Sequence, residues 1–147
     1  MTAICFVDAN VLVYAVGRSE PQKRQIANAW LTQLWTAGAG RTGTQVLNEF
    51  YVIATARLRQ RVTATAARLV IEQYFAWQPV AIDRSLIAAG WGIQDRFRFS
   101  SWDSLIVAAA QKATCKFLLT EDLQHLQNLD GLVVLNPFKA ELQDFLN

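Results

Sequence analysis

Short uninterrupted runs of apolar residues recur along the chain and predict buried strands. Four of them lie at 4–7, 80–82, 117–119 and 133–135, and we expect a further strand at 40–43. None of the four alternates between apolar and polar positions, as a strand with one face in water would. These runs therefore predict a sheet whose strands are covered on both faces.

Longer segments between these runs carry apolar residues at three- and four-residue steps, which is typical of amphipathic helices. We expect helices at 21–35, at 45–58 after Thr44 as N-cap, at 63–76, at 83–97, and at 102–113 after Ser101 as N-cap. Strands separated by helices favour crossover connections and parallel pairing. The sequence thus predicts an α/β fold, a three-layer α/β/α sandwich around a mainly parallel sheet of four or five strands.

The composition is that of one globular unit. The chain has 147 residues, 52% of them hydrophobic, and contains no internal repeat, low-complexity tract or linker, so we expect residues 1–147 to form a single domain. Cys5 and Cys115 are too few for a disulfide framework and predict buried free thiols in a reducing compartment. Without a basic leader or an apolar stretch of about 20 residues, we expect a soluble, cytoplasmic protein.

The charge is distributed unevenly along the chain. The net charge of +2 is too small to indicate a nucleic-acid partner by itself. Residues 1–68 hold eight basic and three acidic side chains, whereas residues 69–147 hold six basic and nine acidic ones. This asymmetry could give a polar gradient across a binding cleft, or it could reflect only solvated helix faces.

Four acidic residues have positions that would bring them to one edge of the predicted sheet. Asp8 follows the first strand, and Asp122 follows the strand at 117–119 after two further residues. Asp103 lies in the first turn of the helix at 102–113, and Glu49 lies within two turns of Thr44. In open α/β sheets the functional site lies outside the carboxyl ends of the strands. We therefore expect these four acids to converge in one pocket.

Carboxylates crowded together repel one another, and a divalent cation relieves that repulsion. Oxygen ligands without a nearby His or Cys cluster favour Mg²⁺ or Mn²⁺ over zinc. Such an ion can polarise a phosphoryl oxygen and lower the pKa of bound water, which suits hydrolysis of a phosphodiester. Each acid taken alone also has an ordinary role in a turn, a cap or a solvated helix face, so only their joint placement indicates function.

The segments around these acids resemble those of the PIN-domain ribonucleases and, within that family, the VapC-type toxins of toxin–antitoxin pairs. The matching segments are 6–14 (FVDANVLVY), 44–51 (TQVLNEFY), 101–110 (SWDSLIVAAA) and 118–123 (LLTEDL), with 135–138 (LNPF) near the end. They occur in the family's order and cover nearly the whole chain.

The resemblance implies a cytoplasmic, metal-dependent endoribonuclease that hydrolyses RNA phosphodiester bonds. It also implies a homodimer held inactive by a cognate antitoxin protein, whose peptide enters the active-site groove. By their positions in the matching segments, Asp8 and Asp103 are implied as the principal ligands of Mg²⁺ or Mn²⁺. Glu49 and Asp122 would complete the catalytic quartet, by binding a second ion or orienting the water.

Two further residues are implied as supports, and two positions depart from the family pattern. Asn10 resembles the residue that fixes the first aspartate, and Thr120 resembles a hydroxyl beside the fourth acid. Ala9 stands where the family often has Thr or Ser, which removes a side-chain hydrogen bond near the metal. Leu126-Gln127 stands where Gly-Gln is common, which puts the loop after Asp122 in doubt.

Several residues near the expected site keep two interpretations. His125, the only histidine, could act as a general acid or hydrogen-bond the following loop. Trp102, next to Asp103, could pack in the core or stack on a base. Arg57, Arg59 and Arg61 could complement a helix dipole or meet RNA phosphates.

Two other functions remain open. A DNA nuclease or phosphoester hydrolase could use the same acidic pocket, and comparison of substrates would separate these from a ribonuclease. A non-catalytic interaction module could keep the pocket only to bind a partner. The complete set of four acids argues against the module, because the loss of any one acid would be enough to turn a nuclease into such a module.

Overall fold

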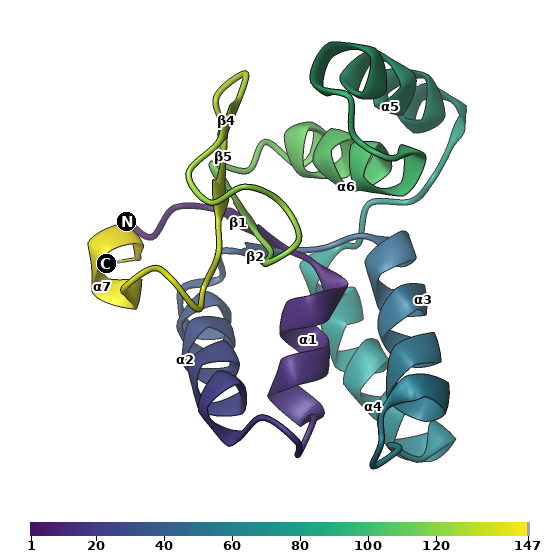
Figure 1. The fold of residues 1–147 in the computed structure, drawn as a ribbon, viewed down its shortest axis with the longest axis vertical. Helices are drawn as coiled ribbons and strands as arrows, with labels where there is room; N and C mark the ends of the chain where they lie inside the picture. Colours follow the sequence, from purple (N-terminus) through teal and green to yellow (C-terminus); the bar gives the residue numbers. More distant parts are fainter. Residues whose placement is uncertain (147) are drawn as a thin grey trace.

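A computed structural model describes residues 1–146 of the chain (Figure 1). At its centre lies a five-stranded sheet with the strand order β2-β1-β3-β5-β4. The strands are β1 (Cys5–Val7), β2 (Gly40–Arg41), β3 (Phe117–Leu119), β4 (Asn128–Leu129) and β5 (Leu132–Leu135). The pairs β1–β2, β1–β3 and β3–β5 are parallel, and only β4 runs antiparallel to its neighbour. The predicted mainly parallel sheet is confirmed.

Helices cover both faces of this sheet. The helices are α1 (Ala9–Val16), α2 (Pro21–Ala37), α3 (Thr44–Val52), α4 (Ala64–Tyr74), α5 (Arg84–Phe97), α6 (Ser101–Lys112) and α7 (Leu142–Phe145), with a π-helical turn η1 (Ile53–Arg57) after α3 and a 3₁₀ turn η2 (Phe75–Trp77) after α4. Helices α1 to α4 lie on one side of the sheet, and α5 and α6 lie on the other (Figure 1). The three-layer α/β/α sandwich is therefore confirmed. Among residues 1–146, no helix combines the length and the hydrophobicity needed to cross a bilayer.

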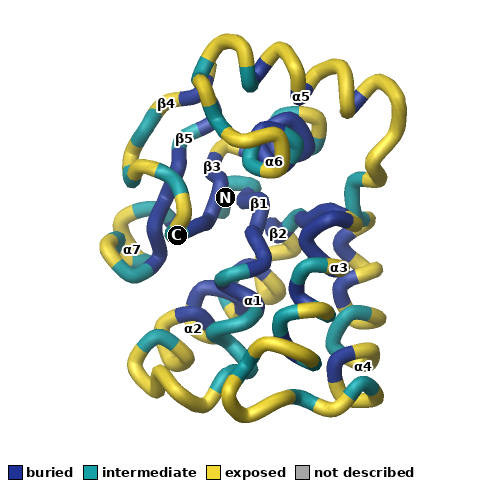
Figure 2. The backbone as a smooth tube through the Cα atoms, turned by 45° about the vertical axis from the view of Figure 1, so that its right-hand side comes forward, coloured by how far each residue is buried: buried dark blue, intermediate teal, exposed yellow. Residues whose placement is uncertain are grey.

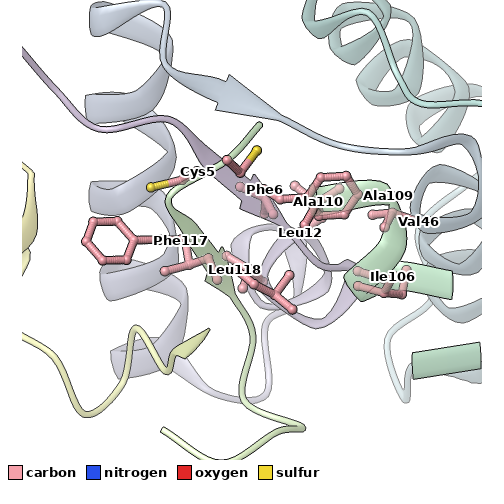
Figure 3. Close-up of a cluster of buried hydrophobic side chains, with 14 of the residues drawn as sticks. Cys5, Phe6, Leu12, Val46, Ile106, Ala109, Ala110, Phe117 and Leu118 are labelled. Carbon is pink, nitrogen blue, oxygen red and sulfur yellow. The ribbon is translucent and has the colours of Figure 1, made fainter. Parts of the chain in front are cut away.

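The central strands form the core, as their uninterrupted apolar sequences predict. All residues of β1 and β3 are buried, and Figure 2 shows these strands enclosed by helices whose outer faces are exposed. Figure 3 shows side chains of β1 and β3 in one cluster with side chains of α1, α3 and α6. Cys5 and Cys115 are both buried free thiols, and burial raises the pKa of each to about 12. Both thiols are therefore neutral and serve as small apolar side chains.

Helix α1 was not among the predicted helices. Its eight residues are almost all apolar and give no helical periodicity, so the segment reads as a continuation of the buried strand. The chain turns at Asp8, whose side chain accepts a hydrogen bond from the Ala9 amide and begins the helix. The helix forms because tertiary packing against α2 and α3 buries its apolar side chains.

Other local predictions were wrong by small amounts. The expected strand at 80–82 is reduced to one parallel bridge between Val80 and Gly43, because the sheet edge at β2 is only two residues long. The short hairpin of β4 and β5 was not predicted; its turn depends on Gly131 with a φ of 101°. The N-caps of α3 and α6 are Gly43 and Ser100, each one residue earlier than expected.

Gly40 in β2 is the position where an added methyl group should be most damaging. A Cβ atom built at this residue would lie 2.3 Å from the ring of Trp77. Trp77 is only 5% exposed and packs against Trp35 and Tyr74, each with a ring-centroid distance of 4.8 Å. The ring therefore has no free space into which to move. Gly40→Ala is expected to reduce the free energy of unfolding by about 2–3 kcal/mol in urea denaturation.

The matched control for this substitution is Gly92→Ala. Gly92 lies inside α5, and a Cβ there would have no neighbour within 4 Å. Alanine is a better helix former than glycine, so this variant should be about 0.5–1 kcal/mol more stable than the wild type. Equal stability of the Gly40→Ala variant and the wild type would contradict the tight packing of β2 on Trp77.

Candidate active site

Asp8 lies where β1 ends and α1 begins, and it is almost fully enclosed. The residue is 6% exposed. Its Oδ1 accepts a hydrogen bond from the Ala9 amide at 2.7 Å, and its Oδ2 accepts one from the Thr120 hydroxyl at 2.9 Å. Because β1 pairs in parallel with β3, Asp8 and Thr120 emerge at the same edge of the sheet.

The surroundings of Asp8 raise the pKa of its carboxyl group from 3.8 to about 7. Burial is the main cause, and the charges of Glu49 and Asp122 add to it, whereas the hydrogen bonds from Ala9 and Thr120 act in the opposite direction. In these surroundings the ionised carboxylate is strongly destabilised unless it takes up a proton or binds a cation.

Asn10 and Thr120 connect Asp8 to Asp122. The Asn10 side-chain amide donates to Asp122 Oδ2 at 3.1 Å, to Thr120 Oγ1 at 3.0 Å and, at the longer distance of 3.4 Å, to Asp8 Oδ2. The Asp122 amide donates in turn to the Thr120 hydroxyl at 3.2 Å. The two supporting residues implied by the sequence are thus in contact with the first and fourth acids, although their role in catalysis stays a prediction.

Glu49 lies on α3, where Gln45 holds it from one turn earlier. The Gln45 Nε2 donates to Glu49 Oε1 at 3.2 Å and to the Trp102 carbonyl at 3.3 Å. Gln45 therefore connects the helix that carries Glu49 to the beginning of the helix that carries Asp103. Sequence analysis missed this residue, although its four-residue spacing from Glu49 was a signal for it.

Asp103 is half-buried in the first turn of α6, after Ser100 as N-cap. The pKa of its carboxyl group is raised, chiefly by burial and further by the charge of Asp122, against a hydrogen bond from Ser100. Asp122 therefore interacts electrostatically with Asp103 as well as with Asp8. Electrostatic interactions thus connect Asp8 with Glu49 and Asp122, and Asp122 with Asp103, so the four acids lie near one another.

Two adjoining hollows open beside these acids. The smaller has a volume of about 280 Å³, and Asp8, Asn10, Glu49 and Asp122 contribute to its walls. The larger is a groove of about 700 Å³ along α3 and η1. Glu49 and Ile53 line both, so the hollows meet at Glu49. Asp103 lines neither, but its neighbour Trp102 lines the groove.

The acids provide hard oxygen donors without a compensating cation from the protein. The ion pairs within residues 1–146 are Lys23–Glu121, Arg96–Asp130 and Lys112–Asp83, and none of them includes a member of the quartet. Among the same residues, no three His, Cys, Asp or Glu side chains lie close enough together to enclose an ion. The donor set suits Mg²⁺ or Mn²⁺, and the side chains would have to close around such an ion.

Glu121, next to Asp122, differs from the quartet because its charge is compensated. Its carboxylate accepts hydrogen bonds from the Tyr14 hydroxyl at 2.6 Å and from Lys23 Nζ at 3.0 Å. Its backbone amide contacts Asn10 Oδ1 at 3.4 Å. This cluster fixes the segment that carries Asp122. No sequence signal identified Lys23 or Tyr14, because they meet Glu121 only through the fold.

The structure shows where the other residues with two interpretations lie. His125 Nδ1 accepts a hydrogen bond from the Asn136 amide at 3.0 Å, which gives one ring nitrogen a structural role in a loop. Arg57 lines the large groove. Arg59 and Arg61 are exposed in the turn that follows η1. Trp102 is 63% exposed, so of its two interpretations packing in the core is wrong, and stacking on a base stays a prediction.

A sequence model of the PIN domain matches residues 5–132, which is most of the chain. The chain belongs to the PIN domain family. The matched region includes all four acids and strands β1, β2 and β3, but only the first residue of β5, Leu132. The resemblance noted in the sequence is thereby confirmed at the level of the family. No curated protein matches this PIN domain.

Solved structures share the fold of this PIN domain at low sequence identity. One is described as a toxin–antitoxin complex from Klebsiella pneumoniae; it has a TM-score of 0.63 and 18% identity, and covers 92% of this chain and 99% of that chain. Another is Mycobacterium tuberculosis VapC20, described as a sarcin-ricin loop cleaving toxin; it has a TM-score of 0.58 and 18% identity, and covers 78% of this chain and 86% of that chain. These similarities establish a common architecture over nearly the full length.

Proposed function

We propose that this PIN domain is a metal-dependent endoribonuclease and the toxin of a toxin–antitoxin pair. In this proposal residues 1–147 form one nuclease domain that acts as a cytoplasmic homodimer. Its substrate is RNA, and its partner is a cognate antitoxin protein. The observation that carries the proposal is the enclosed Asp8 carboxyl group, with a pKa raised to about 7 by burial and by two further acids.

The acids have separate roles in this proposal. Asp8 and Asp103 would hold a Mg²⁺ or Mn²⁺ ion, and Glu49 and Asp122 would complete its oxygen surroundings or orient the attacking water. When bound, the ion would lower the pKa of water and stabilise negative charge on the phosphate. Asn10 and Thr120 keep the carboxylates of Asp8 and Asp122 oriented through the hydrogen bonds between them. Within residues 1–146 no ion pair includes a member of the quartet, which is consistent with a role for a metal ion.

The toxin assignment is supported by the fold and by what is stated of similar structures. One of them is described as a toxin–antitoxin complex, and VapC20 is described as a sarcin-ricin loop cleaving toxin. All four acids that the resemblance implies are present in this chain, which favours an active nuclease over a module that only binds a partner.

The proposal is tested by incubating the purified protein with single-stranded RNA, single-stranded DNA and a small phosphoester. Mg²⁺ or Mn²⁺ should support cleavage of RNA, and EDTA should stop it. Cleavage of DNA in preference to RNA would replace the ribonuclease with a DNA nuclease. If no substrate is cleaved and calorimetry detects no binding of either ion at millimolar concentration, the non-catalytic module is the better description.

Asn10→Ala is expected to reduce the rate of RNA cleavage by about 10- to 100-fold, which is usual for residues that orient metal ligands. The substitution removes the amide that contacts Asp122, Thr120 and Asp8. Asn28→Ala is the matched control, because the Asn28 amide also makes two hydrogen bonds, to the backbone of Ala15 and Arg24. The control should lose stability but keep its rate; equal rates in both variants would remove the orienting role of Asn10.

A further inference from the structure

We propose that the large groove along α3 is a binding site for a nucleobase of single-stranded RNA, with Trp102 as its stacking platform. The proposal rests on the proposed ribonuclease function and names the part of the substrate that lies beside the cleaved bond. Asn48 and Arg57 supply the polar contacts along the same groove.

The groove begins at the acidic site and follows one face of a helix. Its lining residues on α3 and η1 recur at three- and four-residue steps and form a single stripe: Gln45, Asn48, Glu49, Val52, Ile53 and Arg57. At 1.5 Å per residue, this stripe is about 18 Å long. Glu49 lines both the groove and the acidic hollow. When the acids hold a phosphodiester, a neighbouring nucleotide must therefore lie at the mouth of the groove or at the mouth of the hollow.

Trp102 has the properties of a stacking platform. It is the second residue of α6, it directly precedes Asp103, and it is 63% exposed on the wall of the groove. Its carbonyl group is held by Gln45, the residue that also contacts Glu49. The indole ring is therefore carried on backbone that is fixed relative to the acids. A base stacked on it would cover apolar surface that water now contacts.

The remaining wall combines an apolar stretch with polar groups. Val52 and Ile82 are 37% and 41% exposed, which gives a base edge a second apolar contact. The exposed Asn48 side chain makes no hydrogen bond within residues 1–146, so its donor and acceptor are both available to a base edge. Arg57 lies at the far end of the stripe, where a positive charge would meet the next phosphate.

These features favour RNA over a peptide as the occupant. The groove is continuous with the acids through Glu49, and it ends at a cation. A single aromatic platform with one amide beside it suits an unstacked base, which presents a π face and a hydrogen-bonding edge. A peptide helix would instead need a row of apolar pockets, whereas the two ends of this stripe are polar.

The test measures RNA binding by fluorescence anisotropy in the Asp8→Asn background, where the proposed cleavage does not consume the probe. The probes are fluorescein-labelled eight-residue oligomers of A, C and U, together with an abasic ribose-phosphate oligomer of the same length. Trp102→Ala should weaken binding of at least one base-containing oligomer by roughly 5- to 100-fold, the range expected for one stacked base. Binding of the abasic oligomer should not change.

Trp91→Ala is the matched control, because Trp91 is 62% exposed on α5 and lies outside the groove. It should bind every oligomer as the parent protein does, and Trp102→Phe should retain most of the affinity. Thermal unfolding of each variant checks its fold. Unchanged affinity in Trp102→Ala, or an equal loss for the abasic oligomer, would overturn the base site and leave the groove to a peptide partner.

The same experiments distinguish a failure of the base site from a failure of the proposed ribonuclease function. If the wild-type protein cleaves RNA and Trp102→Ala has unchanged kcat/KM and unchanged affinity, only the base site is rejected. If the wild-type protein cleaves no RNA and binds none of the oligomers, the ribonuclease proposal is itself rejected.

Discussion

Replacing Asp8 by Asn is expected to abolish RNA cleavage and, in the absence of divalent ions, to stabilise the fold. The loss of rate should be at least about 1000-fold, because the substitution removes a proposed metal ligand and several kcal/mol of charge stabilisation with it. The gain in stability follows from the burial of this carboxyl group, which is 6% exposed and close to two other acids. A neutral amide of the same shape removes the buried charge and can still accept the Ala9 hydrogen bond.

The two effects are measured separately, the rate with Mg²⁺ or Mn²⁺ present and the melting temperature in EDTA at about pH 8. For a protein of this size, a gain of 2 kcal/mol would raise the melting temperature by roughly 5–10 °C. Asp95→Asn is the control, since Asp95 is exposed on α5 and away from the acidic hollow. A variant that keeps its activity would remove Asp8 from the site, and one that loses activity through unfolding would contradict the stability argument.

In EDTA, the contribution of Asp8 to stability should fall as the pH rises from about 4 to about 7. The folded protein holds the Asp8 proton with a pKa of about 7, compared with an ordinary value of 3.8 in the unfolded chain. Because the folded state binds this proton more tightly, the stabilisation is fully present below about pH 4 and is lost as the pH passes through 7. The shift of about three units corresponds to an upper limit of about 4 kcal/mol.

This change is isolated by comparing the wild type with Asp8→Asn in urea denaturation across the same pH range. The difference between the two free energies of unfolding should grow in favour of the variant up to about pH 7 and then level off. Saturating Mg²⁺ should reduce the difference, because an ion that binds only the folded wild type stabilises it. A difference that does not vary with pH would show that Asp8 is ionised in the folded protein throughout this range.

Local sequence patterns were sufficient to predict an element when burial of all its side chains, or a polar residue at its beginning, determines its structure. The strands around Phe6, Leu118 and Val134 could be predicted because strands buried on both faces must be apolar throughout. Asp83 was correctly placed at the beginning of α5, where its side chain accepts a hydrogen bond from the Leu86 amide. Helix α1 could not be predicted, because its apolar composition fits a buried strand as well as a buried helix.

In the candidate site, too, some features could be predicted from the sequence and others could not. The positions of Asp8, Glu49, Asp103 and Asp122 at strand ends and helix beginnings predicted that they converge, and Asp8, Glu49 and Asp122 do line one hollow, whereas Asp103 lies outside it. The contacts that hold them were not predictable from spacing: Asn10 meets Asp122 across 112 positions, and Lys23 meets Glu121 across 98. The first pair follows from the parallel register of β1 and β3, and the second also needs α2 to pack on α1; no local pattern specifies either arrangement.

The sequence by itself determined the family and the layered architecture, because each depends on residue type and order along the chain, and it singled out the four acids of the proposed site. Only the tertiary structure decided that Asp8 is buried beside Glu49 and Asp122, that Glu121 is compensated by Lys23, and that Trp102 is exposed on a groove. The physical reason is that burial and charge interactions depend on distances between distant segments. Those distances are fixed only when the sheet and its covering helices pack together.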